Sequence, residues 1–75
     1  MEVDLTIREN IVESMVPVVN HMMEGDRAIY RKGKSNWTGK RSPEMIMAWD
    51  LYQIGKVHLV QRKSGEEYEY IMVRR

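Results

Sequence analysis

The N-terminal third of the chain has the hydrophobic spacing of an amphipathic helix. Apolar residues recur with helical periodicity over 7–24, and Gly25 stands where a helix would end. Thr6–Glu9 fits a capping box at the start, so we favour a helix over the alternative of a short strand in residues 3–7. Pro17 lies inside the helical segment, where we expect a kink or a division into two shorter helices.

The second half of the chain predicts a helix followed by a β-hairpin. Ser42 and Pro43 are favourable at the N-cap and first helical position, and the helix is predicted over 43–54 with apolar residues around most of its circumference. Two β-rich runs, 57–63 and 66–73, flank Ser64-Gly65, which we predict to be the turn.

The hairpin and the segment before the second helix complete the predicted fold. With Ser64-Gly65 as the turn, Arg62 lies opposite Glu67 in a favourable cross-strand pair. Residues 25–41 are predicted to be a connecting loop, in which Ala28–Tyr30 alone has the character of a short strand. The sequence therefore predicts one α+β domain over 1–75, with two helices packed on a C-terminal antiparallel β-hairpin.

Length and composition narrow the class of protein. A chain of 75 residues without cysteine excludes a multi-domain enzyme and a disulfide scaffold, and no apolar run is long enough to span a membrane. The acidic start, residues 1–4, is unlike a signal peptide, so we expect a cytoplasmic protein without membrane contact. So small a domain buries little surface as a monomer, which favours a homodimer.

The chain offers little for catalysis. Without cysteine there is no thiol nucleophile, and His21 and His58 fall in different predicted elements outside any metal-ligand spacing. The serines lack the sequence context of a catalytic nucleophile. We therefore expect a non-catalytic protein without cofactor or metal.

Charge is strongly segregated along the chain. The net charge is +1, yet residues 1–26 sum to −5, residues 27–41 carry six bases and no acid, and residues 42–75 sum to zero. Phosphate binding needs clustered cations, small residues that admit backbone amides, and an aromatic plane for stacking bases. The basic segment has all three, which favours a nucleic-acid-binding protein with a regulatory role. The predicted contact residues are Arg31, Lys32, Lys34, Trp37, Lys40 and Arg41, with Arg62 and Lys63 at the hairpin tip.

The order of elements from residue 42 onward resembles the second half of a winged-helix DNA-binding domain. The residues that carry the resemblance are Leu51–Val57, where the helix gives way to the hairpin, and the hairpin tip Arg62–Gly65. The resemblance implies a helix in the major groove and a hairpin that contacts the DNA backbone. Because the helix offers acidic Asp50 and no base, we expect the basic segment and the hairpin tip to make the contacts instead. The small, cysteine-free chain is also similar in style to accessory proteins of phages and mobile elements.

A second hypothesis is a protein-binding adaptor or inhibitor. In that case the basic segment docks on an acidic partner, and Met45, Trp49 and Tyr52 or the hairpin edge provide the apolar contact. The sequence leaves both hypotheses open.

Overall fold

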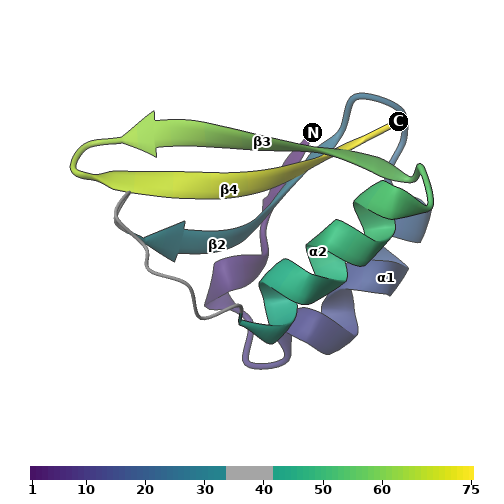
Figure 1. Ribbon diagram of the computed structural model, residues 1–75, viewed down its shortest axis with the longest axis horizontal. Coiled ribbons are helices and arrows are strands. Elements are labelled where there is room, and N and C mark those ends of the chain that lie inside the picture. Colours follow the sequence, from purple (N-terminus) through teal and green to yellow (C-terminus); the bar gives the residue numbers. More distant parts are fainter. Residues whose placement is uncertain (34–41) are drawn as a thin grey trace.

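The computed structural model describes residues 1–33 and 42–75 as a four-stranded sheet with two α-helices against one face (Figure 1). The strand order is β1-β2-β4-β3, in which β1 is parallel to β2 and the other neighbours are antiparallel. The elements are β1 (Glu2–Asp4), the 3-10 helix η1 (Leu5–Ile7), α1 (Ile11–His21), β2 (Arg27–Gly33), α2 (Pro43–Gln53), β3 (Val57–Ser64) and β4 (Glu67–Arg74).

The fold class is α+β with two helices, as predicted, but the predicted sheet is incomplete. The hairpin β3–β4 is not a separate unit, because β2 pairs with β4 and β1 pairs in turn with β2. The two central strands of the sheet therefore come from the middle and from the C-terminal end of the described chain.

The first predicted helix, 7–24, is wrong at both ends. The carboxylate of Asp4 accepts hydrogen bonds from the backbone N–H and hydroxyl of Thr6, which closes η1 in place of the predicted capping box. α1 then begins at Ile11 and continues through Pro17 as one helix. It ends at His21 because Met22 adopts an extended conformation.

The predicted loop 25–41 contains the strand β2, Arg27–Gly33. Its buried centre, Ala28–Tyr30, is the segment that the sequence indicated as a possible short strand, but the strand continues through charged residues as far as Gly33. A β-bulge adds to this, since the register with β4 shifts between Ile29 and Arg31. The extra residue in the bulge breaks the period-2 alternation on which strand prediction depends.

The second helix and the hairpin agree more closely with the prediction. α2 begins at Pro43 as expected, with Ser42 at the N-cap position although its hydroxyl makes no capping hydrogen bond, and it ends at Gln53, one residue early. The strands β3 and β4 pair so that Ser64 lies opposite Glu67, and Gly65-Glu66 is the turn.

The predicted hairpin register was wrong by two residues. A two-residue turn with a positive φ at its first position needs glycine there, and Gly65 has φ +63°. Arg62 consequently lies opposite Glu69 and not Glu67. A shift of two leaves every side chain on its predicted face, which is why the apolar pattern alone did not reveal the error.

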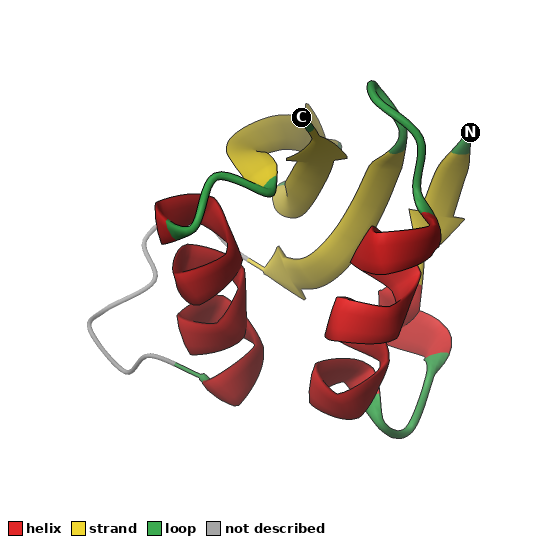
Figure 2. Ribbon diagram, turned by 90° about the vertical axis from the view of Figure 1, so that its right-hand side faces the viewer, coloured by secondary structure: helices red, strands yellow, loops and turns green. Residues whose placement is uncertain are grey.

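The main core lies between the sheet and the helices (Figure 2). Its fully buried members come from five elements and the residue Leu5 of η1; they are Leu5, Met15, Val19, Ala28, Ala48, Val57 and Met72. Ile29 and Ile71 form a separate buried pair, directly opposite each other on neighbouring strands. They lie on the face turned away from the helices, which we call the outer face of the sheet.

Candidate functional site

The structure places Arg31, a predicted nucleic-acid contact, against a helix. Its Nη1 donates a hydrogen bond to Oε1 of Glu44 in α2 at 2.7 Å, and both side chains are largely buried. The bulge in β2 causes this contact, because it turns Arg31 to the helix side of the sheet. Partial burial would raise the pKa of Glu44, but hydrogen bonds, including the one from Arg31, outweigh burial and lower it.

Arg62 reaches from one edge of the sheet to the other. Its two terminal nitrogens donate to the carboxylate oxygens of Glu2 at 3.0 and 3.1 Å, and its Nε donates to Oε1 of Glu69 at 2.9 Å. The hydrogen bonds from Arg62 hold the pKa of Glu2 below its ordinary value, and both carboxylates raise the pKa of Arg62.

Lys32 belongs to the same network on the outer face. Its Nζ lies 2.8 Å from Oδ2 of Asp4 and 3.9 Å from Oε2 of Glu69. The hydrogen bonds from Lys32 and Thr6 lower the pKa of Asp4, and the carboxylate of Asp4 in turn raises the pKa of Lys32. We call Glu2, Asp4, Lys32, Arg62 and Glu69 the outer-face network.

The predicted basic site is thus only partly assembled among the described residues. Arg31, Lys32 and Arg62 are each held by carboxylates of the same chain, so a phosphate would have to compete with those partners. Lys63 is exposed and makes no ion pair within residues 1–33 and 42–75. The other predicted contacts lie outside the described residues; they are Lys34, Trp37, Lys40 and Arg41.

The two helices present a more distinctive surface. They lie side by side with the same direction: Glu13 and Glu44 line one groove at their N-terminal ends, and Lys56 donates to Asn20 at 2.8 Å near their C-terminal ends (Figures 1 and 2). Five large apolar side chains of this layer stay exposed, and we call them the helix-layer surface. They are Val16, Ile46, Trp49, Tyr52 and Ile54, with exposed fractions from 37% to 66%.

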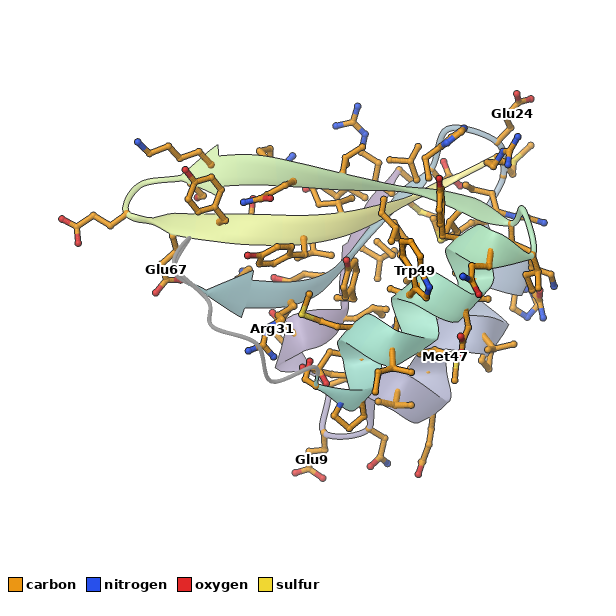
Figure 3. The ribbon with its side chains drawn as sticks, viewed as in Figure 1. Glu9, Glu24, Arg31, Met47, Trp49 and Glu67 are labelled. Carbon is orange, nitrogen blue, oxygen red and sulfur yellow. The ribbon has the colours of Figure 1, made fainter. Side chains whose placement is uncertain are left out.

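An aromatic pair lies on one flank of α2. The rings of Trp49 and Tyr52 are 5.3 Å apart between centroids and tilted by 38°, and the two side chains are 44% and 41% exposed. Figure 3 shows Trp49 and Met47 on opposite flanks of α2, as residues two positions apart in a helix must be. Met47 packs against the core, so the flank with Trp49 is the one open to a partner.

The charged side chains on the helix layer are acidic. Neither α1 nor α2 contains a lysine or arginine, and their carboxylates are Glu13, Glu44 and Asp50. Glu9, Glu13 and Glu44 line a groove of about 270 Å³ between the N-terminal ends of the helices. Asp50 lies one turn from both Ile46 and Ile54, so its charge sits within the apolar surface.

Two further features lie elsewhere on the molecule. An apolar groove of about 350 Å³ runs between β1 and the flank of α1 turned away from α2; Val3, Pro17 and Val18 are among the residues that line it. Lys56 and Arg74 meet where β3 begins and β4 ends, since Nη1 of Arg74 donates to the carbonyl oxygen of Lys56 at 2.8 Å.

Within the part of the chain that the structure describes, no group of acidic or histidine side chains is arranged to hold a metal ion. In that same part, neither helix combines the length and apolar character needed to cross a membrane.

Sequence reasoning identified Trp49 and Tyr52 as candidate apolar contacts but missed the acidic helix layer. The sequence could have indicated this layer, because residues 9–26 and 42–55 contain no lysine or arginine. Comparison of the chain with protein-family models, with curated proteins and with solved structures gives no match, so the arrangement of the described residues carries the case for function.

Proposed function

We propose that the protein is a non-catalytic protein-binding module and that the helix-layer surface is its contact surface. The observation that carries this proposal is the exposure of five large apolar side chains on two adjacent helices, including the Trp49–Tyr52 pair. Clustered apolar side chains that stay exposed, as the Trp49–Tyr52 pair does, mark interaction sites, and tryptophan and tyrosine are enriched among the residues that dominate binding energy.

The ion pairs of the basic residues also favour the helix-layer surface as the contact surface. Three of the four predicted nucleic-acid contacts within the described residues, Arg31, Lys32 and Arg62, already hold carboxylates. Trp49, in contrast, is held at a fixed position by a regular helix and a neighbouring ring while 44% of it remains exposed. Such a rigid, half-exposed aromatic side chain binds a partner at a low cost in conformational entropy.

Site-specific photo-cross-linking in the native host tests the proposal. A photoreactive amino acid replaces Ile46 on the helix-layer surface or, as the matched control, Val60 on the outer face of the sheet. The two positions are similarly exposed, at 47% and 42%. We expect a discrete protein adduct from position 46 that is absent from position 60 and that weakens at least about tenfold with Trp49→Ala, as for a residue central to an interface.

Equal adducts from both positions, or none from position 46 in a folded protein, would overturn the proposal. Circular dichroism of each variant establishes that the fold is retained. An adduct that survives Trp49→Ala unchanged would also count against the assignment of the aromatic pair.

Nucleic-acid binding is a second candidate, and we propose it on one observation. Lys56, Lys63 and Arg75 carry positive charge without a carboxylate partner among the described residues; Lys63 lies near the hairpin turn and the other two lie beyond the C-terminal ends of the helices. Titration of a labelled duplex and a labelled single strand at two salt concentrations tests it. Binding that falls steeply with salt and weakens in the Lys63→Ala variant supports this candidate, and the absence of binding at low salt removes it.

A further inference from the structure

The charges around the helix-layer surface indicate the sign of the charge on its binding partner. Glu13 and Asp50 are exposed and make no ion pair within the described residues, whereas Glu44 is held by Arg31. An apolar partner segment that settles on Ile46 therefore brings its own rim close to Asp50 and Glu13, and neither helix contains a base. Among the described residues, the bases Lys56 and Arg75 lie beyond the C-terminal ends of the helices, next to Ile54. A rim of the same sign would be repelled, and a basic rim would be attracted.

The same charges argue against a second copy of this chain as the occupant. A symmetric dimer through this patch brings the exposed carboxylates Glu13 and Asp50 of both copies into one interface, to which α1 and α2 themselves contribute no lysine or arginine. Uncompensated like charges at a closing interface lose hydration without gaining a partner. A polyanion such as a nucleic acid is disfavoured on this face for the same reason.

The shape of the layer favours a helix as the bound element. Two helices side by side present ridges and grooves into which a third helix packs, and a groove lined by Ile11, Val12 and three glutamates lies between their N-terminal ends. Ile46 and Ile54 lie about two turns apart along α2 with Asp50 between them, a spacing that suits the apolar repeat of an amphipathic helix.

We propose that the partner of the helix-layer surface is an amphipathic helix of another protein, with an apolar stripe flanked by lysine or arginine. This inference rests on the proposed function and adds the sign of the partner's charge. The sequence predicts an acidic partner for the basic segment, whereas the helix-layer surface favours a basic one.

Two designed helical peptides of one length and one leucine stripe test the inference. One carries lysine and the other glutamate on both sides of the stripe, and fluorescence anisotropy of the labelled peptides measures binding. We expect saturable binding of the lysine peptide with a preference of about tenfold or more over the glutamate peptide, and we expect salt to reduce that preference. Equal binding of the two peptides, or binding of neither, overturns the inference.

Charge-reversal variants establish that the local carboxylates are responsible. Glu13→Lys with Asp50→Lys is expected to reverse the preference. Glu66→Lys with Glu67→Lys makes the same change in net charge at the exposed hairpin turn and is expected to leave the preference intact. Equal effects of the two double variants would show that net charge alone is responsible, which overturns the inference.

The cross-linking at position 46 keeps the two proposals separate. An adduct between position 46 and a different protein, together with no charge preference among the peptides, would support the proposed function and would overturn the inference that the partner is a basic helix. An adduct with twice the mass of the chain would identify a second copy and would likewise overturn the inference.

Discussion

Ile71 provides a sharp test of the outer-face network. Its side chain is completely buried although it points away from both helices, and the charged side chains of the network lie on the same face of the sheet. Truncation by Ile71→Ala removes three buried carbon atoms, worth about 0.8 kcal/mol each, and leaves a cavity, so we expect a loss of about 3–4 kcal/mol in the free energy of unfolding.

Val60 is a matched control for this truncation. It lies directly opposite Ile71 on β3 and on the same face, but it is 42% exposed. Val60→Ala removes two partly buried carbon atoms and is expected to cost about 1 kcal/mol. After allowance of about 0.8 kcal/mol for the third carbon atom of isoleucine, the difference between the variants measures how much more deeply Ile71 is buried than Val60.

Urea denaturation followed by circular dichroism measures both losses. A protein of this size has a total stability of roughly 4–11 kcal/mol, so Ile71→Ala approaches the lower limit for a folded variant. Ile71→Val, with an expected loss of about 0.5–1.5 kcal/mol, keeps the comparison measurable. A loss of about 1 kcal/mol or less for Ile71→Ala, equal to that for Val60→Ala, would refute the burial of Ile71 on this face.

Three further predictions follow from the geometry. The folded-state pKa values of Glu2 and Asp4 lie below their ordinary values of 4.5 and 3.8. The stability that these carboxylates contribute is therefore complete above the ordinary values and is lost as the pH falls through the folded-state values, which urea denaturation at a series of pH values measures. A loss at low pH that Glu2→Gln leaves unchanged would contradict this prediction. Burial raises the pKa of Tyr30 to about 12, so a titration followed by tyrosinate absorbance should show one tyrosine that ionises at higher pH than an exposed one and that is lost in Tyr30→Phe. The free energy of unfolding should also decline as the pH rises from 10 to 12. Gly65 has φ +63°, so Gly65→Ala should lower the free energy of unfolding by about 1–2 kcal/mol. Gly33 has an ordinary φ and open space around it, so Gly33→Ala should be nearly neutral. Equal thermal midpoints of the two variants would argue against the assigned conformation of the hairpin turn.

The elements that were predicted correctly depend on local signals. Pro43 begins a helix because its own geometry suits that position, and the faces of the hairpin follow from alternation. For β2 the sequence indicated only the centre, Ala28–Tyr30. The full length of the strand was missed because it is defined by pairing with neighbours on both sides and because the bulge at Tyr30 interrupts its alternation. The capping box failed because Asp4, two residues before Thr6, offered a closer acceptor.

The candidate site shows the same division. The aromatic residues Trp49 and Tyr52 were identified because an apolar circumference is visible along one helix. The ion pairs that occupy the predicted basic residues were not visible, since Arg62 and Glu2 are 60 positions apart in the sequence. Within the described part of the basic segment, clustering along the chain did not indicate that Arg31 and Lys32 are held by carboxylates.

The strand order constrains how the chain reaches this fold. β2 and β4 form the central seam of the sheet, and β4 is the last strand of the described chain. During synthesis, β1, α1 and β2 emerge first with a single three-residue parallel pairing between them and without the strand that covers the other edge of β2. Residues 1–33 can pack on α2 once it emerges, but their sheet stays incomplete until residues 67–74 are present. The central β2–β4 pairing therefore joins distant parts of the chain and closes late in folding.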